Sequence, residues 1–334
     1  MSLDVLVTMP FSDAQLARVR AVASEVRVDR AEPGAADYTR TDVLYAGVPP
    51  RDLARAPNLR WVQLHMAGVN ALYDHPLYTD SALALTTTSG VHAATIAEYA
   101  ITMLLALAHR VPTMVDWQRR GGWPPDAERW PLFVPTEVRD ATLGIIGYGS
   151  IGRELARIAT SAFAMRVLAC KRDPQHRQDT GYCPPGTGDP EGRLPEAWFP
   201  PEKLRDLLAR SDVVVMAAPL TKDTERMLGA AELAAMKPSA YFINVGRGAT
   251  VDEPALAAAL RERRLAGAAI DVFAEEPPPP GHPFYSLDNV IVSPHVSGFL
   301  PSYDDRCVDL FAENLRRFLA GAPLLNLVDR VKGY

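Results

Sequence analysis

The sequence predicts an α/β protein built from two doubly wound parallel-sheet domains with a cleft between them. Two observations support this fold class. Short apolar runs alternate with stretches of helical periodicity along most of the chain, and this alternation stops near Trp117 and starts again at Thr142. The length of 334 residues also suits two domains of ordinary size.

The first hundred residues alternate expected strands and helices. Ser12 and Asp13 can cap a helix over Ala14–Ala23, and a longer apolar pattern predicts a buried helix over Ala93–His109. Strands are expected at Leu3–Thr8, Val43–Ala46, Leu59–Leu64 and Ala82–Thr86. This βαβ rhythm implies a parallel sheet with helices on both faces.

The stretch Trp117–Pro135 interrupts the pattern, because it contains a Gly-Gly pair, several prolines and three tryptophans. One interpretation is an arm that lies on another surface, since exposed tryptophans favour contact sites. The other is a loop that folds back on its own domain. The composition favours neither.

A second βαβ series begins after this interruption. Strands are expected at Thr142–Ile146, Arg166–Cys170, Asp212–Ala217, Tyr241–Val245, Ala268–Val272 and Val290–Ser293. Helices are expected over Ile151–Phe163, Pro201–Ala209, Glu253–Arg263 and Ser302–Leu319. The polar, Pro/Gly-rich stretch Pro174–Pro201 predicts a mobile loop without catalytic residues.

The composition narrows the possible partners. Hydrophobic residues make up 48% of the chain and charged residues 22%, as in folded globular proteins. The net charge of −5 argues against nucleic acid, because phosphate binding needs a clustered positive surface. The apolar stretch Ile96–Ala108 is interrupted by Glu98 and is too short to cross a bilayer, so no membrane partner is expected.

Cysteine usage predicts the compartment. Cys170, Cys183 and Cys307 are widely spaced and odd in number, so they fit neither a disulfide framework nor a CxxC metal site. The N-terminus lacks the basic and apolar regions of a signal peptide. We therefore expect a cytoplasmic protein without a metal.

A glycine motif predicts a dinucleotide site. A predicted strand runs directly into G-x-G-x-x-G, formed by Gly147, Gly149 and Gly152, and a helix follows. The glycines permit a tight turn, close approach of a pyrophosphate and close helix–strand packing. The N–H groups of Ser150 and Ile151 at the helix start would face the phosphates. A glycine turn without a ligand is the alternative.

The next strand bears on the choice between NAD and NADP. NAD-binding sites usually place an acidic residue here to hold the ribose 2′-OH. This sequence instead has Lys171 and Arg172, which would attract a 2′-phosphate. We expect NADP to be preferred, and NAD remains the alternative if Asp173 serves as the acidic residue.

Three charged segments follow predicted strands of the second series. They contain Arg247, the pair Glu275 and Glu276, and His295. Singly, each is typical of a surface charge, but the carboxyl ends of parallel strands meet at one edge of a sheet. Together they suit hydride transfer at a carbonyl. A glutamate would hold His295, whose ring would protonate the carbonyl oxygen, and Arg247 would bind a substrate carboxylate.

These segments and others resemble the D-isomer-specific 2-hydroxyacid dehydrogenase family over nearly the whole chain. The motifs that carry the resemblance are Ala67-Gly68-Val69, Ala97-Glu98-Tyr99, the glycine motif, Asn244-Val245-Gly246-Arg247-Gly248, Asp271-Val272-Phe273 with Glu276-Pro277, and Ser293-Pro294-His295. The resemblance implies an NAD(P)-dependent oxidoreductase that acts at C2 of a small D-2-hydroxy or 2-oxo acid. Lys171 and Arg172 resemble the NADP-using glyoxylate/hydroxypyruvate reductases.

The resemblance also implies the site. Arg247, Glu276 and His295 would be catalytic, with Glu276 preferred over Glu275 because it precedes the proline. The substrate would contact Ala67, Gly68 and Val69 through backbone N–H groups, besides Arg247 and His295. Cofactor contacts would be Gly147, Gly149, Ser150, Ile151, Gly152, Lys171, Arg172, Ala218, Pro219, Thr224, Val245, Gly246, Asp271, Ser297, Gly298 and Thr95, with Asp271 on the nicotinamide carboxamide.

The family's domain plan implies a discontinuous, flavodoxin-like substrate domain of residues 1–98 and 299–334. A Rossmann cofactor domain would span residues 99–298. The family's usual homodimer would form through the arm at residues 110–140.

Some features depart from the family or leave other functions open. Thr86–Gly90 stands where the family commonly has an Asn-x-Pro-Gly turn, and His65 and His92 lie near the expected substrate loops without an assigned role. A formate dehydrogenase-like enzyme would use other catalytic residues, and Glu276 argues against it. A dinucleotide-sensing, co-repressor-like interaction protein would bind the cofactor without turnover.

Overall fold

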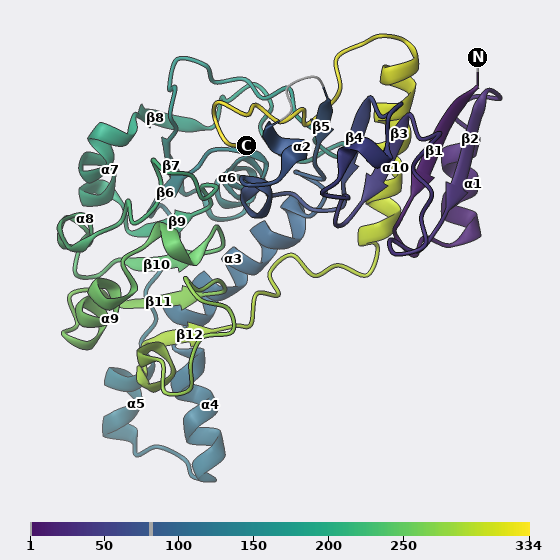
Figure 1. Ribbon diagram of the computed structural model, residues 1–334. Helices are drawn as coiled ribbons and strands as arrows, with labels where there is room; N and C mark the ends of the chain where they lie inside the picture. Colours follow the sequence, from purple (N-terminus) through teal and green to yellow (C-terminus); the bar gives the residue numbers. More distant parts are fainter. Residues whose placement is uncertain (1, 80–82) are drawn as a thin grey trace. The chain divides into compact units, whose positions relative to one another are not determined.

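A computed structural model describes residues 2–79 and 83–334 and divides into two compact units (Figure 1). The first unit comprises the chain up to His92, Thr180–Pro184 and Leu300–Tyr334. The second comprises Ala93–Asp179 and Pro185–Phe299. The first boundary therefore falls six residues before the expected position, between residues 92 and 93. The short segment 180–184, expected in the cofactor domain, belongs to the first unit.

The sheet of the first unit has five parallel strands in the order β2-β1-β3-β4-β5, which is the flavodoxin-like order. The strands are β1 Leu3–Val7, β2 Val26–Arg30, β3 Val43–Ala46, β4 Trp61–Leu64 and β5 Ala84–Thr86. Strand β2 was not expected, and Ala82, the expected start of β5, lies outside the described residues.

Helices cover one face of this sheet. Helix α1 (Asp13–Arg20) begins with a capping box between Ser12 and Gln15, as the sequence predicts for Ser12. The last helix, α10 (Tyr303–Leu319), packs beside α1 (Figure 1). It buries Phe311 in the core formed with the strands. The other apolar layer includes the short elements η1 Leu53–Arg55, η2 Asn70–Leu72 and α2 Pro76–Thr79.

The sheet of the second unit has seven parallel strands in the order β12-β11-β10-β9-β6-β7-β8. The strands are β6 Thr142–Ile146, β7 Arg166–Cys170, β8 Pro195–Phe199, β9 Val213–Met216, β10 Tyr241–Asn244, β11 Gly267–Ile270 and β12 Val290–Val292. The chain starts at β6, proceeds to β8 on one side and continues from β9 on the other. The switch point between β6 and β9 is where such sheets bind ligands.

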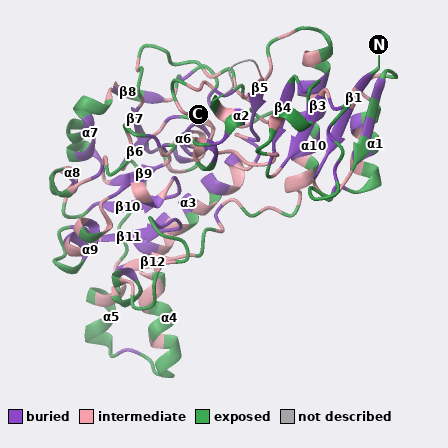
Figure 2. Cartoon of the chain, in the orientation of Figure 1, coloured by how far each residue is buried: buried purple, intermediate pink, exposed green. Residues whose placement is uncertain are grey.

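Helices cover both faces of the second sheet. Helices α3 (Ala93–Ala108) and α6 (Ser150–Phe163) pack together on one face. The other face carries α7 Leu204–Arg210, α8 Ala230–Ala234 and α9 Glu253–Arg261, with the short turns η3 Pro201–Lys203, η4 Gly248–Thr250 and η5 Pro283–Ser286 nearby. Buried residues are concentrated in the strands of both units (Figure 2). The predicted α/β class with two parallel sheets is confirmed.

The tryptophan-rich segment is helical, which corrects the expectation of an irregular arm or loop. Helices α4 (Val111–Arg120) and α5 (Asp126–Phe133) form a hairpin, and the Pro and Gly residues fall mostly at their ends. Gly121, for example, ends α4 with φ of 68°. Every residue of both helices is at least partly exposed (Figure 2). Trp123 and Trp130 are 79% and 76% exposed.

The stretch Pro174–Pro201 is not a simple mobile loop. It contains β8 and is anchored to α6 by Arg153, which is only 2% exposed. The Arg153 guanidinium donates to the carbonyl oxygens of Asp189 and Arg177, and its Nε lies 3.2 Å from the Asp179 carboxylate. Buried polar anchors of this kind hold a polar segment in one conformation.

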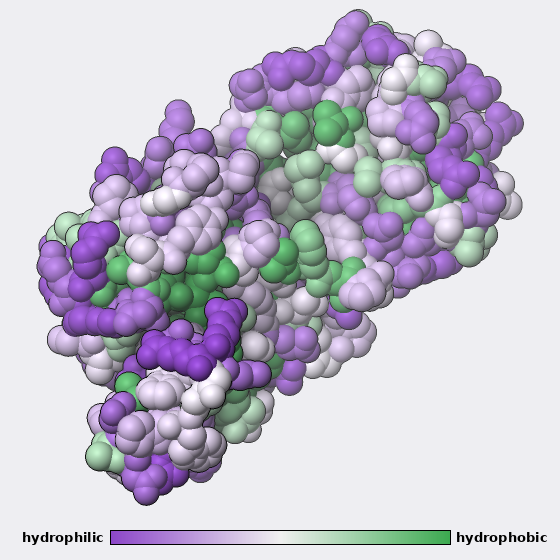
Figure 3. All heavy atoms as spheres, turned by 90° about the horizontal axis from the view of Figure 1, so that it is seen from below, coloured by the Kyte–Doolittle hydropathy of each residue, from purple (hydrophilic) through white to green (hydrophobic). Residues whose placement is uncertain are grey.

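Within the described residues, no single helix is long and apolar enough to span a membrane. Helices α3 and α4, which meet at a 62° bend, reach the length and apolar composition of a membrane span only when taken together. On the face shown in Figure 3, hydrophilic side chains predominate and apolar side chains form separate small groups.

Candidate active site

In the second unit, nearly all predicted site residues follow the carboxyl ends of strands. Because the strands are parallel, these ends form one edge of the sheet. Three loops carry mainly the residues expected to bind the cofactor: the three glycines after β6, Lys171 and Arg172 after β7, and Ala218 and Pro219 after β9. The other three loops carry the charged residues and their neighbours: Val245 to Arg247 after β10, Asp271 and Glu276 after β11, and His295, Ser297 and Gly298 after β12. Thr95 lies in the first turn of α3.

The glycine loop has a shape that suits a pyrophosphate. A Cβ on Gly147, whose φ is 92°, would lie 2.5 Å from the backbone nitrogen of Ala218. A Cβ on Gly152 would lie 2.7 Å from the carbonyl oxygen of Gly147. At Gly149 a Cβ would meet nothing within 4 Å, so the backbone there is open to a ligand. Ser150 and Ile151 form the first turn of α6, where helical N–H groups attract anions.

The loop after β7 carries two cationic side chains, Lys171 and Arg172, and one acidic side chain, Asp173, which bonds the backbone of its own turn. The Lys171 ammonium donates to the carbonyl oxygen of His176 at 2.5 Å, and Arg172 pairs with Asp223 at 3.0 Å. The Asp173 carboxylate accepts from the backbone N–H groups of Gln175 and His176, at 3.0 and 3.4 Å. Asp173 therefore shapes its own turn.

The turns after β9 and β10 lie against each other. Thr224 closes the first turn, because its hydroxyl donates to the carbonyl oxygen of Pro219 at 2.7 Å. Val245 is buried and donates its N–H to Met216. A Cβ on Gly246 would lie 2.8 Å from the carbonyl oxygen of Ala218, so only glycine lets the two turns approach this closely.

A histidine–carboxylate pair lies at the end of the sheet. His295 Nδ1 lies 2.7 Å from Glu276 Oε2, and the two side chains are 47% and 37% exposed. The other oxygen of Glu276 accepts the backbone N–H of Phe273 at 3.0 Å, which fixes the carboxylate. The contact with His295 is made by Glu276 rather than by the adjacent Glu275.

Arg247 is half-buried beside this pair. Burial lowers the pKa of the Arg247 guanidinium, and the negative charge of Glu276 opposes that shift. Its guanidinium donates to the carbonyl oxygen of Gly246 at 2.7 Å. Its own carbonyl oxygen accepts from Asn244 and Thr250, which fixes the backbone from which the side chain extends.

Asp271 is completely buried, and both of its oxygens face the loop that carries His295. Oδ1 accepts from Ser293 Oγ at 2.6 Å and from the N–H of Val296 at 2.9 Å, while Oδ2 accepts from the N–H of Ser297 at 3.0 Å. The expected contact of Asp271 with a nicotinamide carboxamide stays a prediction.

In the first unit, the expected substrate loop follows β4. No acceptor among the described residues takes the backbone N–H groups of Ala67, Gly68 or Val69. N–H groups without internal acceptors are available to an anionic ligand. The loop itself is held in place, because Thr88 donates its N–H to the carbonyl oxygen of Met66 at 3.1 Å.

His65 lies next to this loop in a polar group that the sequence did not reveal. Its Nδ1 lies 2.8 Å from the Tyr45 hydroxyl, and its Nε2 lies 3.4 Å from the Asp304 carboxylate. Burial lowers the pKa of His65, and Asp304 opposes that shift. The Tyr303 hydroxyl donates to the carbonyl oxygen of His65 at 2.9 Å, and the Tyr303 ring stacks on His92.

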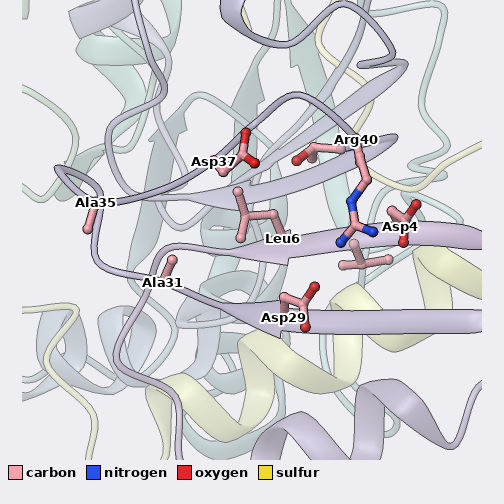
Figure 4. Close-up of a pocket in the computed structure, with 9 residues that line it drawn as sticks. Asp4, Leu6, Asp29, Ala31, Ala35, Asp37 and Arg40 are labelled. Carbon is pink, nitrogen blue, oxygen red and sulfur yellow. The ribbon is translucent and has the colours of Figure 1, made fainter.

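A cavity of about 260 Å³ lies elsewhere in the first unit (Figure 4). Asp4, Asp29, Asp37 and Arg40 line it, and none of the predicted site residues takes part. The groups of His, Cys, Asp and Glu in the described part of the chain include none that could hold a metal ion.

Comparison with known proteins decides the family. Residues 101–297, more than half of the 334, match the family described as "D-isomer specific 2-hydroxyacid dehydrogenase, NAD binding domain". The chain belongs to this family. A glyoxylate reductase of Aeropyrum pernix is 35% identical over 289 residues, which cover 83% of this chain and 78% of the relative.

Solved structures of the same family share the fold over the full length of the chain. A D-isomer specific 2-hydroxyacid dehydrogenase from Xanthobacter autotrophicus Py2, in complex with NADPH and MES, is 29% identical, with a TM-score of 0.81 and complete coverage of both chains. An NADPH-dependent glyoxylate/hydroxypyruvate reductase from Sinorhizobium meliloti, in complex with NADP and sulfate, is 26% identical, with a TM-score of 0.78 and the same coverage.

This dehydrogenase is therefore an NAD(P)-dependent oxidoreductase, as the motifs predict. Two residues near its site were not singled out from the sequence. Tyr99 and Ser293 contact each other across 194 positions of the chain. Both lie within motifs that carried the family resemblance, Ala97-Glu98-Tyr99 and Ser293-Pro294-His295, but nothing in the sequence pairs them.

Proposed function

We propose that this dehydrogenase is an NADP(H)-preferring reductase of small 2-oxo acids such as glyoxylate or hydroxypyruvate. The observation that carries the proposal is the His295–Glu276 pair at 2.7 Å, with Arg247 beside it, at the sheet edge that carries the glycine loop. The names of the relatives from Aeropyrum pernix and Sinorhizobium meliloti support this substrate class.

The residues around the switch point fit a bound dinucleotide. Gly147, Gly149 and Gly152 would hold its pyrophosphate, with the turns at Ala218 and Gly246 beside it. When bound, the nicotinamide supplies hydride to a carbonyl carbon or accepts it from an alcohol.

Each charged residue then has a role that its geometry suits. Glu276 engages Nδ1 of His295, which leaves Nε2 to give a proton to the carbonyl oxygen. Arg247 cannot lose its charge at neutral pH, so its guanidinium would bind the substrate carboxylate. In the first unit, the N–H groups of Ala67–Val69 have no acceptor among the described residues and are available to a substrate carboxylate.

The preference for NADP rests on the loop after β7. Lys171 and Arg172 supply two cations, while Asp173 is occupied by the N–H groups of its own turn. We expect the double variant Lys171→Ala/Arg172→Ala to lower kcat/KM for NADPH by about 100-fold, from the loss of charge-assisted hydrogen bonds, with a much smaller change for NADH. A wild-type enzyme that favours NADH would contradict this preference.

The activity is tested by mixing the purified protein with NADPH and glyoxylate and following the nicotinamide absorbance. His295→Ala and Arg247→Ala are expected to lower kcat/KM by at least about 100-fold. Glu276→Ala should also lower it, whereas Glu275→Ala, a matched neighbour, should not. Binding of NADPH without turnover of any 2-oxo acid would overturn the proposal and favour a dinucleotide-sensing protein.

We also propose that the protein forms a homodimer through the α4–α5 hairpin. The support is the exposure of Trp123 and Trp130, because exposed aromatic residues are enriched at protein interfaces. Light scattering after size-exclusion chromatography should give a dimer mass. The double variant Trp123→Ser/Trp130→Ser should shift that mass toward the monomer, and a wild-type monomer would contradict the proposal.

The reducing cytoplasm is the proposed compartment. Cys170 and Cys307 lie buried in different units, and burial raises the pKa of both thiols to about 12. Such thiols are unreactive and have no role in a disulfide framework.

A further inference from the structure

The loop after β12 folds around a single residue. Three consecutive backbone N–H groups, those of His295, Val296 and Ser297, all donate to Asp271. The N–H of His295 donates to the backbone carbonyl oxygen of Asp271 at 2.9 Å, and the N–H groups of Val296 and Ser297 donate to the Asp271 carboxylate. Asp271 is fully buried, so water does not compete for these bonds. The position of the His295 backbone is therefore set by Asp271.

His295 adopts a backbone conformation that requires such support. Its φ is 54°, in the left-handed region that side chains other than glycine rarely occupy. A residue persists in this region only when the surrounding structure fixes it. The hydrogen bonds to Asp271 begin at His295 itself and continue through the next two residues, so they fix the direction in which the imidazole extends.

Asp271 is in turn held by a chain of two hydroxyl groups. Ser293 Oγ lies 2.6 Å from Asp271 Oδ1 and also contacts the hydroxyl of Tyr99. A carboxylate only accepts, so the single proton of Ser293 goes to Asp271, and Tyr99 must donate to Ser293. Burial raises the pKa of Tyr99 to about 12, so the phenol keeps this proton throughout the working range of an enzyme.

The chain of hydroxyls joins two parts of the second unit. Tyr99 is part of α3, which packs against α6, the helix that begins at the glycine loop. Ser293 and Asp271 belong to the loops after β12 and β11. The helix layer behind the dinucleotide site is thus connected to the loop that presents His295.

We infer that Tyr99 and Ser293 are positioning residues, which act through Asp271 to hold His295 in place for proton transfer. The inference rests on the proposed role of His295. In this role the Tyr99 and Ser293 hydroxyl groups do not touch substrate or cofactor, and each acts through Asp271. A small displacement of a proton donor lowers the rate of the chemical step more than it weakens binding.

The test compares four variants in steady-state kinetics with NADPH and glyoxylate. Tyr99→Phe and Ser293→Ala each remove one hydroxyl and are expected to lower kcat by about tenfold, with KM for glyoxylate and Kd for NADPH within about twofold of wild type. Ser293→Thr keeps the hydroxyl and should restore most of the rate. Tyr241→Phe is the matched control, because this buried tyrosine bonds Thr136 at 3.0 Å in the same core, away from the loop.

Several results would overturn the inference. Among them are wild-type kcat in Tyr99→Phe and Ser293→Ala, an equal loss in Tyr241→Phe, a change in KM alone, and failure of Ser293→Thr to restore the rate. Each of these leaves the proposed function intact, because the wild-type enzyme still turns over.

A second readout works without turnover. If wild-type protein fails to reduce any 2-oxo acid, the proposed function fails, but amide hydrogen exchange still reports on the loop. Exchange at Val296 and Ser297 should become about tenfold faster in Tyr99→Phe and remain unchanged in Tyr241→Phe, because local opening governs exchange. Equal exchange in all variants would refute the positioning contacts themselves.

Discussion

Two loops that follow parallel strands use their backbone N–H groups in opposite ways. After β12, the consecutive N–H groups of residues 295–297 all donate to Asp271. After β4, the consecutive N–H groups of residues 67–69 meet no acceptor in the described part of the chain. The first loop presents a side chain, so its backbone is held by internal bonds. The second presents its backbone, so its donors stay available.

The comparison separates two ways in which a loop after a strand can serve a binding or catalytic role. A proton donor must keep a fixed direction, which a loop achieves when its own backbone is fully hydrogen-bonded. A carboxylate can be held by backbone donors alone, provided that the surrounding chain holds the loop in shape. Three substitutions test this difference, and they follow in order of the expected effect.

The largest effect is expected from Asp271→Ala. It would leave the buried N–H of Ser297, the partly buried N–H of Val296 and the Ser293 hydroxyl without their acceptor, at about 1–3 kcal/mol for each unsatisfied donor. We expect the free energy of unfolding, measured by urea titration, to fall by about 3 kcal/mol after partial relief by water. Asp288→Ala, which breaks the exposed pair with Arg263, should change it by less than about 1 kcal/mol. Equal effects in the two variants would contradict a special role of the β12 loop.

A smaller effect, confined to substrate binding, is expected from Ala67→Pro. The substitution removes one of the three available N–H groups. We expect KM for glyoxylate to rise about tenfold, because this corresponds to the free energy of one hydrogen bond to a charged group. The Kd for NADPH and the thermal unfolding midpoint should stay near those of wild type. Ala67→Gly keeps the N–H group and is the control. An unchanged KM in Ala67→Pro would show that this loop does not bind the substrate through its backbone.

The smallest effect is expected from Tyr303→Phe. This change removes the hydroxyl that donates to the carbonyl oxygen of His65, at the start of the substrate loop. The loop keeps its bond from Thr88, so we expect KM to rise only about threefold, the value of one neutral hydrogen bond. Tyr78→Phe removes a comparable hydroxyl, bonded to Arg330, in the same unit and should leave KM unchanged.

The sequence predicted most of the strands, including β5 and β12 at sheet edges, and missed β2 and β8 at the opposite edges. Strands β3, β6 and β7 occur at the expected residues, because buried parallel strands are continuous apolar runs. Strand β2 lies at one edge of its sheet and includes charged, exposed residues such as Arg27. Strand β8, at the edge of the other sheet, starts with a proline and follows a Pro/Gly-rich stretch. Both missed strands mix buried and exposed residues, so their apolar pattern is weak.

The sequence predicted which loops carry the site residues, but not which side chains of different loops and helices contact each other. Each charged residue follows a recognisable strand, so the edge on which Arg247, Glu276 and His295 lie could be inferred from parallel topology. The pairing of Tyr99 with Ser293 could not, because it depends on how α3 packs across the sheet. The same holds for Asp271, whose neighbours in space are set by the β12 loop rather than by its own strand.

The order of strands in the larger sheet separates the loop expected to set coenzyme preference from the loops that carry the proposed proton donor and its partners. The loop after β7, with Lys171 and Arg172, is separated from the loops after β10 to β12 by the intervening strands β6 and β9. Effects of distant substitutions usually add. A change in coenzyme preference can therefore evolve, or be engineered, one loop at a time, without new compensating changes around the proton donor.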